Sequence, residues 1–418
     1  MVKEIKEIIS IKYSLFGKLF DIMVRHNYKK KLAELKRKKS PIKVVFLSLE
    51  NQKWGYDSLY KLFEQDEHFE PLILVSLHRD INNGKMDVNP QIVEENYQFY
   101  KSRGYNVDYL YKDSHYLDLK SFKPDIVFYE QHWGWYEACK PATVSKYALT
   151  MYLPYGFSML DFKADYRNNF HRDLFKMFVL NNNSVQRYEE YRKGNSYNCL
   201  PVGYSKLDTY LDTTDIDLSH FWKEPEKFKI IYAPHHSMKE GSLQTATFLK
   251  NGKKILELAK LHPETTWVFK PHPRFDITLR ELGFSVEVIK EYYEEWAKIG
   301  KVYTKGDYFD IFKSSDLMIT DCCSFLGEYL PSGNPVIRPI NENSIELNKT
   351  GREIVSSYYE VKNNNELENV FEMIVTRHED PKLELRKSIM PSIIDFKEKS
   401  ADKIFKFIKS EITTLEKR

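Results

Sequence analysis

The stretch from Ser314 to Pro339 constrains the fold more than any other part of the chain. It predicts a short apolar strand at Leu317–Thr320, a polar turn at Asp321–Ser324, a second helix, and a second strand at Pro335–Arg338. A short strand that is apolar throughout is typical of a parallel sheet with both faces covered by helices. Ligands of such open sheets bind beyond the carboxyl ends of the strands, which is where this turn lies.

The turn and the helix after it predict an anion-binding site. Small residues leading into a helix leave backbone N–H groups pointing outward at the positive end of the helix dipole, which suits a phosphate or pyrophosphate. Ser324 is a candidate N-cap or phosphate donor, and Glu328 lies on the same helix face, where its carboxylate can accept hydrogen bonds from ribose hydroxyls. The alternative is that Ser324 only caps the helix and that Glu328 is solvated.

Strands and helices alternate on both sides of a polar segment, which predicts an α/β chain with two domains. Its 418 residues are enough for two separate cores. We expect a doubly wound sheet in residues 41–210, a linker at 211–227, and a second Rossmann-like domain at 228–390. The tail, residues 391–418, predicts a helix from Ile393 that crosses back onto the first domain.

The composition describes an ordered protein that stays on the side of the membrane where it is made. Its hydrophobic share of 42% and charged share of 29% exclude a disordered chain. No apolar run reaches the roughly 20 residues of a membrane span, and no signal peptide is visible. The four cysteines lack metal-ligand spacing, so no metal is expected, and the adjacent Cys322 and Cys323 suit a reducing cytoplasm.

Residues 1–40 predict a basic amphipathic helix, with 12 Lys/Arg against 4 Asp/Glu in a chain of net charge +3. Such a helix can lie in the headgroup layer at the inner face of the cell membrane, and the alternative is that it packs on the protein body or on a partner. No nucleic-acid module accompanies the lysines, so nucleic acid is not an expected partner. The apolar residues at near-helical spacing are Ile5, Ile8, Ile9, Tyr13, Leu15, Phe16, Leu19, Phe20 and Met23.

Three loops of the second domain directly follow predicted strands, at Pro234–Ser237, Pro271–Arg274 and Asp321–Ser324. Because the carboxyl ends of neighbouring parallel strands meet at one edge, we expect these loops to converge. Cations and oriented N–H groups are what a nucleotide diphosphate needs, both when it binds and when it departs as a leaving group. The predicted donor-binding residues are His235, His236, Lys270, His272, Arg274, Asp321, Cys323, Ser324 and Glu328.

Several segments of the chain form a recognisable set. They are YAPHH at 232–236, PHP at 271–273, DIFKSSDLMITDCCSFLGEYL at 310–330, NPVIRP at 334–339 and, less closely, YLPYGFSMLD at 152–161 and CLPVGYSKLD at 199–208. These segments resemble the CDP-glycerol glycerophosphotransferase family, which includes the teichoic acid polymerases and related capsule and O-antigen transferases. The resemblance implies a GT-B fold, meaning two Rossmann-like domains facing a cleft, with the donor bound mainly by the second domain and the acceptor by the first.

The resemblance implies transfer of a glycerol-phosphate-type unit from a CDP-linked donor to a hydroxyl of a lipid-linked glycan or teichoic-type polymer, without a cofactor. An inverting nucleotide-sugar-dependent glycosyltransferase of capsule or O-antigen biosynthesis fits the same segments. A non-catalytic nucleotide-binding protein and a two-domain epimerase, which would need no acceptor, also stay open.

The chain departs from the family where a catalytic base is expected. Pro154-Tyr155-Gly156 stands in place of Trp-His-Gly, and a phenol, with an ordinary pKa near 10, is a poor base at neutral pH. The catalytic candidates are therefore Glu130 and His132 at the end of a predicted strand, together with Tyr155, although His132 could instead pack against Trp133 or Trp135. The predicted acceptor-binding residues are Glu50, Asn51, Trp54 and Asp161.

Overall fold

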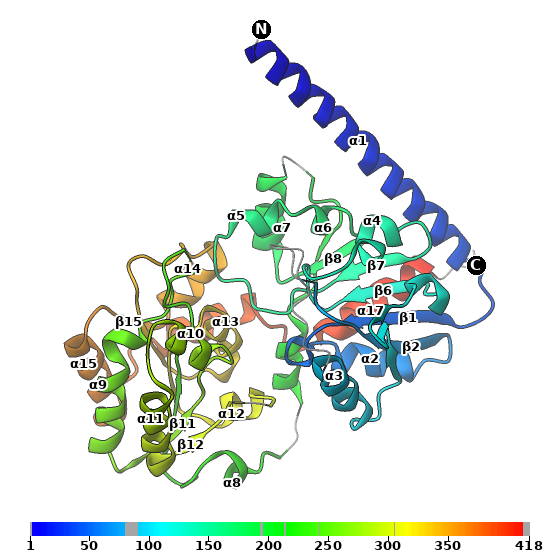
Figure 1. Ribbon diagram of the computed structural model, residues 1–418. Coiled ribbons are helices and arrows are strands. Elements are labelled where there is room, and N and C mark those ends of the chain that lie inside the picture. Colours follow the sequence, from blue (N-terminus) through cyan, green and yellow to red (C-terminus); the bar gives the residue numbers. More distant parts are fainter. Residues whose placement is uncertain are drawn as a thin grey trace. The chain divides into compact units, whose positions relative to one another are not determined.

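The computed structural model describes residues 2–79, 91–192, 195–212, 215–241, 243–304 and 306–412, with side chains from Leu19 onward. The chain forms two compact units. Unit 1 consists of Met1–Tyr155, Lys163–Ser205 and Lys397–Arg418, and unit 2 consists of Gly156–Phe162 and Lys206–Phe396. Each unit has its own parallel β-sheet, so the chain has the α/β architecture that the sequence predicted (Figure 1).

The sheet of unit 1 has seven strands in the order β3-β2-β1-β6-β7-β8-β9, and every pair of neighbours is parallel. Along β1, Val44 and Phe46 pack into the core on one face while Val45 and Leu47 pack into the core on the other. Both faces are buried, which explains the continuous apolar strands. The strands are β1 (Ile42–Ser48), β2 (Phe69–Val75), β3 (Val107–Tyr109), β6 (Ile126–Tyr129), β7 (Leu149–Tyr152), β8 (Lys176–Val179) and β9 (Cys199–Pro201), with a separate antiparallel pair of β4 (Tyr111–Lys112) and β5 (His115–Tyr116).

Helices cover both faces of this sheet. The C-terminal helix α17 belongs to unit 1, where Ala401, Ile404 and Ile408 share a core with Phe46 of β1. The tail was predicted to be helical from Ile393, but α17 begins only at Ser400, after a short 3-10 turn that contains a proline. The α-helices of unit 1 are α1 (Val2–Leu35), α2 (Asp57–Glu64), α3 (Gln91–Lys101), α4 (Pro141–Val144), α5 (Lys163–Tyr166), α6 (Asn169–Arg172), α7 (Asn182–Tyr191) and α17 (Ser400–Ile412).

Unit 2 has a six-stranded parallel sheet in the order β12-β11-β10-β13-β14-β15. Ile230, Trp267 and Ile319, from three neighbouring strands, lie in one core with helices α9, α11 and α15. Its strands are β10 (Phe228–Ala233), β11 (Thr265–Phe269), β12 (Lys301–Val302), β13 (Leu317–Thr320), β14 (Val336–Pro339) and β15 (Tyr359–Val361). Its α-helices are α8 (Leu218–Phe221), α9 (Phe248–Leu261), α10 (Phe275–Glu281), α11 (Val286–Ile299), α12 (Phe309–Ser314), α13 (Cys323–Glu328), α14 (Lys349–Ser356), α15 (Asn364–Val375) and α16 (Leu383–Ile389).

Two segments differ from the expected division of the chain. The polar stretch expected as a linker packs on unit 2, because Trp222 is 1% exposed and its indole N–H donates to Ser314 Oγ at 2.9 Å. The segment after β7 also belongs to unit 2: the Asp161 N–H donates to the carbonyl of Glu346 at 2.8 Å. Asp161 is therefore not part of unit 1, in which an acceptor-binding role was predicted for it.

The second half of α1 is anchored in unit 1. Val24 and Tyr28 are buried, and the Tyr28 hydroxyl donates to the carbonyl of Asp173 at 2.6 Å. Lys31 Nζ lies 2.9 Å from Asp125, which also pairs with Lys38. The chain therefore uses this half of the basic helix for packing on its own body. Among the described residues, no helix is both long enough and apolar enough to cross a membrane.

Candidate functional site

Three loops meet at the carboxyl edge of the unit 2 sheet. They follow β11, β10 and β13, which are neighbours in that order. The loop after β11 is joined to the loop after β10 by a hydrogen bond from the His272 N–H to the carbonyl of Pro234 at 3.1 Å. The sequence placed these loops at strand ends, and the structure brings them together as expected.

The buried carboxylate of Asp321 holds the loop after β10 in place through hydrogen bonds. One of its carboxylate oxygens accepts the His235 N–H at 2.6 Å, and the other accepts the N–H and the hydroxyl of Thr247 at 2.6 and 2.7 Å. The side chain is 4% exposed, and burial raises the pKa of Asp321 from 3.8 to about 6. Because its oxygens are committed to the loop and to the start of α9, Asp321 holds the histidine loop in place instead of contacting a ligand.

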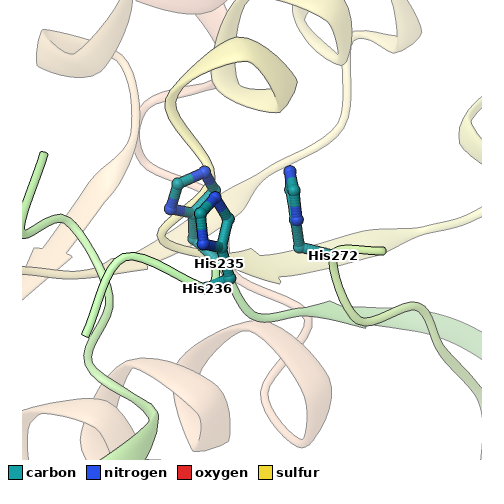
Figure 2. A group of neighbouring side chains, drawn as sticks. All are labelled: His235, His236 and His272. Carbon is teal, nitrogen blue, oxygen red and sulfur yellow. The ribbon is translucent and has the colours of Figure 1, made fainter. Parts of the chain in front are cut away.

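Three histidines form a cluster on the loops after β10 and β11 (Figure 2). The ring centres of His236 and His272 are 4.2 Å apart, and that of His235 lies 4.6 and 4.9 Å from them. One nitrogen of each ring lies within 4.8 Å of the other two, a spacing that a metal ion or an anion could bridge. Burial lowers the pKa of His235 to about 3 and that of His272 to about 2, so both rings are neutral near pH 7.

Lys270 brings a positive charge to the same edge. Its side chain is 6% exposed, and Nζ lies 4.8 Å from the ring centre of Tyr308 and 5.5 Å from that of Phe325. Burial lowers the pKa of Lys270 from 10.5 to about 8, although the nearby Cys322 and Glu328 oppose the shift. A largely buried ammonium that the described residues do not neutralise by a direct ion pair is well suited to receive an anionic ligand.

Arg274 adds a second cation, on the exposed side of the cluster. Its backbone N–H donates to His272 Nδ1 at 3.1 Å, and its residue is solvent-exposed at the start of α10. Its charge contributes to the lowered pKa of His236, after burial. The two predicted cations therefore lie beside the histidines, one buried and one in water.

Helix α13 carries the remaining predicted donor-binding residues. Ser324 is not the N-cap, because the helix begins at Cys323 and the capping position is Cys322. Burial raises the pKa of the Cys323 thiol to about 12, which keeps it a neutral thiol. Glu328 is 1% exposed and accepts a hydrogen bond from the Tyr308 hydroxyl at 2.8 Å, so the alternative of a solvated glutamate is wrong.

Glu130 occupies the same place in unit 1 that Asp321 occupies in unit 2. It directly follows β6, and its carboxylate accepts the N–H groups of Leu49 and Glu50 at 2.7 and 2.9 Å and the hydroxyl of Ser48 at 3.1 Å. The residue is 1% exposed, and burial raises the pKa of Glu130 from 4.5 to about 7. A carboxylate enclosed in this way positions the loop after β1 and is out of reach of a substrate hydroxyl.

His132 is a predicted catalytic candidate that is partly exposed. Its side chain is 14% exposed, with Nε2 3.4 Å from a carboxylate oxygen of Asp165 and Nδ1 3.5 Å from the Tyr152 hydroxyl. Its ring also packs edge-to-face on Trp133 at 4.6 Å, so the expected aromatic packing is present as well. Burial raises the pKa of Tyr155 well above 10, which makes its phenol an even weaker base than usual.

The predicted acceptor-binding residues do not form one group, because three lie at 50–54 in unit 1 and Asp161 lies in unit 2. Trp54 is 8% exposed and packs in the core of unit 1 beside Phe46, so its ring has no free face for an acceptor. The Asn51 N–H is bonded to the side chain of Asn96. Glu50 keeps a side chain that is 37% exposed and pairs with Lys53 Nζ at 2.5 Å. Of the four residues, only Glu50 presents a partly free charged group in unit 1.

Sequence reasoning missed three residues that shape these two edges. Asp165 supplies the carboxylate beside His132. Thr247 precedes α9 and binds Asp321, and a threonine immediately before a helical stretch is a signal that was available in the sequence. Tyr308 reaches Glu328 across 20 positions in the chain, and no local pattern indicates that contact.

No protein-family model and no curated protein sequence matches the chain. Solved structures match its fold. The UDP-GlcNAc 2-epimerase of Neisseria meningitidis bound to UDP-GlcNAc is 12% identical, with a TM-score of 0.58 over 88% of this chain and 100% of that one. The S. aureus MnaA–UDP co-structure is 12% identical, with a TM-score of 0.54 over 88% and 96%. Anabaena Alr3699/HepE in complex with UDP and glucose is 11% identical, with a TM-score of 0.51 over 88% and 100%.

At these identities the likeness identifies the fold alone. The predicted GT-B fold, with two Rossmann-like units, is confirmed. The narrower resemblance to the CDP-glycerol glycerophosphotransferase family stays a prediction.

Proposed function

We propose that this protein is a GT-B transferase that takes a unit from a nucleotide-diphosphate donor and passes it to a hydroxyl of a cell-surface glycan or polymer. The observation that carries the proposal is the edge of unit 2 where three histidines lie together beside the buried ammonium of Lys270. Proteins of similar fold were solved with UDP, UDP-GlcNAc, or UDP and glucose, which supports a nucleotide-activated donor.

Unit 2 binds the donor in this proposal. Its imidazole N–H groups and the Lys270 ammonium stabilise the negative charge that develops on the departing phosphate, because these donors are preorganised in a site with little water. We assign the hydrogen bonds to the ribose hydroxyls to Glu328, whose Oε2 accepts the Tyr308 hydroxyl in the structure. The chemistry assigned to these residues requires no cofactor.

Unit 1 activates the acceptor. Glu130 and Tyr155 are poor candidates for the base, one because its oxygens are occupied and the other because its pKa is raised. We assign the base to His132, which Asp165 orients, so the hydroxyl proton passes to the imidazole as the acceptor oxygen attacks.

Two transfers fit this arrangement. In glycosyl transfer, which the fold neighbours favour, the acceptor oxygen attacks the anomeric carbon, the bond from that carbon to the phosphate oxygen breaks, and a nucleoside diphosphate leaves. In alditol-phosphate transfer, which the sequence resemblance favours, the oxygen attacks the β-phosphorus and a nucleoside monophosphate leaves. Incubation with UDP- and GDP-sugars and with CDP-glycerol or CDP-ribitol, followed by mass analysis of the products, separates them. Conversion of a nucleotide sugar without any acceptor would instead identify an epimerase.

Replacing His272 by alanine should reduce affinity for nucleoside diphosphates by about 10-fold, because it removes one hydrogen bond to a charged phosphate. Thermal unfolding with UDP, CDP and GDP measures the effect, since a ligand at about 100 times its Kd adds about 2.7 kcal/mol of stability. His262, which pairs with Glu264 and Glu372 elsewhere in unit 2, provides the control variant His262→Ala. Equal nucleotide stabilisation of the wild type and His272→Ala would remove the donor-site assignment.

We further propose that the protein works at the inner face of the cell membrane, held there by α1. Leu19, Ile22 and Met23 are 62%, 63% and 45% exposed. At about 100° per residue they lie on the side of the helix opposite the buried Val24 and Tyr28. An exposed apolar stripe on a basic helix fits an anionic lipid surface. The apolar positions predicted before Leu19 lie outside the described side chains.

The triple substitution Leu19→Gln, Ile22→Gln, Met23→Gln should abolish binding to phosphatidylglycerol vesicles without changing the melting temperature. Each side chain contributes roughly 1.5–3 kcal/mol when fully buried in an apolar phase. Co-sedimentation with vesicles measures the loss. Leu249→Gln, Leu261→Gln is a matched control, because these α9 leucines are 54% and 68% exposed. The control variant should bind vesicles as the wild type does, and vesicle binding that survives the triple change would overturn the assignment. Deleting residues 1–38 would be a poorer test, since it removes the buried half of α1.

A further inference from the structure

In two of the three histidines of the cluster, backbone hydrogen bonds determine which ring nitrogen carries the proton. His235 Nδ1 accepts the backbone N–H of Ser237 at 3.2 Å, and His272 Nδ1 accepts the backbone N–H of Arg274 at 3.1 Å. An amide N–H can only donate, so each Nδ1 presents its lone pair. In a neutral imidazole the proton then sits on Nε2. Two rings of the cluster therefore offer N–H donors.

A divalent metal would need the opposite arrangement. A histidine that binds a metal through Nε2 carries its proton on Nδ1 and donates it to an acceptor. At His272 that proton would face the N–H of Arg274, and two donors would oppose each other. At His235 the hydroxyls of Ser237 and Thr245, 2.8 and 3.1 Å from Nδ1, could turn to accept, so His272 is the obstacle.

The charges around the cluster also favour an anion over a metal cation. After burial and the two neighbouring histidines, the positive charges of Lys270 and Arg274 also lower the pKa of His272. Within the part of the chain that the structure describes, the group of converging ligand atoms contains histidines only, with no carboxylate. The nearby carboxylate of Asp321 is occupied by three hydrogen bonds. The carboxylate of Glu281 also acts on His236, but it is paired with Lys239 at 2.6 Å, so the two cations dominate, and they attract an anion and repel a dication.

We infer that His235, His236 and His272 form a seat for one phosphoryl oxyanion, held by the neutral Nε2–H donors of His235 and His272, and are not a divalent metal centre. Naming that oxyanion as a phosphate of the donor rests on the proposed function. The seat itself rests on the backbone bonds to Nδ1. Because the rings need no added proton to donate, binding to the seat should persist well above the usual pKa of histidine.

The proton positions can be observed directly. In protein labelled with ¹⁵N at histidine, two-bond ¹H–¹⁵N correlation spectra should show the Nε2–H form for His235 and His272, and added inorganic pyrophosphate should shift their Nε2 resonances. Co²⁺ should give no absorption band from coordination at the cluster. Nδ1–H forms, or Co²⁺ bound at the cluster with no response to pyrophosphate, would overturn the inference.

Two substitutions at His272 distinguish the ligands. The side-chain amide of His272→Gln can replace the N–H donor, so pyrophosphate affinity should fall no more than about 3-fold, against about 10-fold for His272→Ala. A metal centre would lose its ligand in both variants, and equal losses would contradict the seat. His262→Gln controls for the substitution itself. Pyrophosphate binding without turnover of any activated donor would leave the seat intact and remove the transferase assignment. Turnover that needs a divalent metal bound by these histidines would keep the transferase assignment and remove the oxyanion seat.

Discussion

Replacing Lys270 by methionine should weaken binding of nucleoside diphosphates by at least about 30-fold and, at the same time, make the ligand-free protein more stable. Loss of one member of a buried, hydrogen-bonded charge pair costs about 2–5 kcal/mol, and 1.4 kcal/mol is tenfold in affinity. The amine of Lys270 is the one predicted donor-binding cation whose residue is buried, at 6% exposed, so its removal should have the largest effect on the donor.

The gain in stability follows from the direction of the pKa shift. Burial lowers the pKa of Lys270 from 10.5 to about 8, so between these values the folded state holds fewer protons than the unfolded chain. Stability therefore rises with pH through this window, and below pH 8 the buried charge costs up to about 3 kcal/mol. Methionine keeps an unbranched stem against Tyr308 and Phe325 and carries no charge.

Isothermal titration with UDP or CDP and chemical unfolding at pH 7 and pH 10 test both effects. The stability advantage of Lys270→Met should be present at pH 7 and should shrink toward pH 10, as the wild-type amine loses its proton. Lys253→Met is the control, because the Lys253 side chain is 93% exposed. Unchanged nucleotide affinity in Lys270→Met would show that the buried charge serves something other than the donor.

Relative to the wild type, Glu130→Gln should gain more stability at pH 8 than at pH 5. Burial raises the pKa of Glu130 from 4.5 to about 7, so the folded state holds the proton more tightly than the unfolded chain does. The stability that the Glu130 carboxyl contributes is fully present below pH 4.5 and is lost as pH rises through 7. The loss amounts to about 3 kcal/mol. Glutamine is neutral throughout, and its oxygen can still accept the two backbone N–H groups.

Urea unfolding of wild type and Glu130→Gln across this pH range measures the difference. Glu130→Ala separates charge from hydrogen bonding, because it leaves the donors of Leu49, Glu50 and Ser48 without their acceptor. It should be destabilised at every pH, by about 1–3 kcal/mol for each unsatisfied buried group. A stability difference between wild type and Glu130→Gln that does not change with pH would contradict a buried carboxyl with a raised pKa.

Transfer activity provides the functional half of this test. If Glu130 only positions the loop after β1, Glu130→Gln should retain turnover at neutral pH, whereas His132→Gln should lose it. Loss of turnover in Glu130→Gln with an unchanged melting temperature would restore Glu130 as the catalytic base.

Glu130 and Asp321 show a design shared by the two units. Each acid directly follows the strand beside the first strand of its sheet, β6 beside β1 and β13 beside β10. Each binds backbone N–H groups of the loop after that first strand. A buried carboxylate with these partners fixes a loop that has no regular hydrogen bonds of its own. The loops at both carboxyl edges are therefore held rigid, which is what a site that depends on preorganised donors requires.

The sequence alone determined the elements and the edge on which a ligand should bind. Strand β13 has the predicted bounds, Leu317–Thr320, because a short apolar run between polar turns reports burial on both faces. The histidine loops were placed correctly for the same reason, since they begin where apolar strands end. The short strands β9 and β15 were missed, because three residues carry too little periodicity to be recognised.

Only the tertiary structure decided what the polar side chains do. Asp321 and Thr247 are 74 positions apart and meet because β13 lies beside β10, and the same kind of long-range pairing enclosed Glu130 and placed Asp165 beside His132. Residue type shows that a carboxylate can act as a base. Whether it is free to do so depends on which backbone N–H groups reach it, and those come from strands that local sequence patterns do not connect.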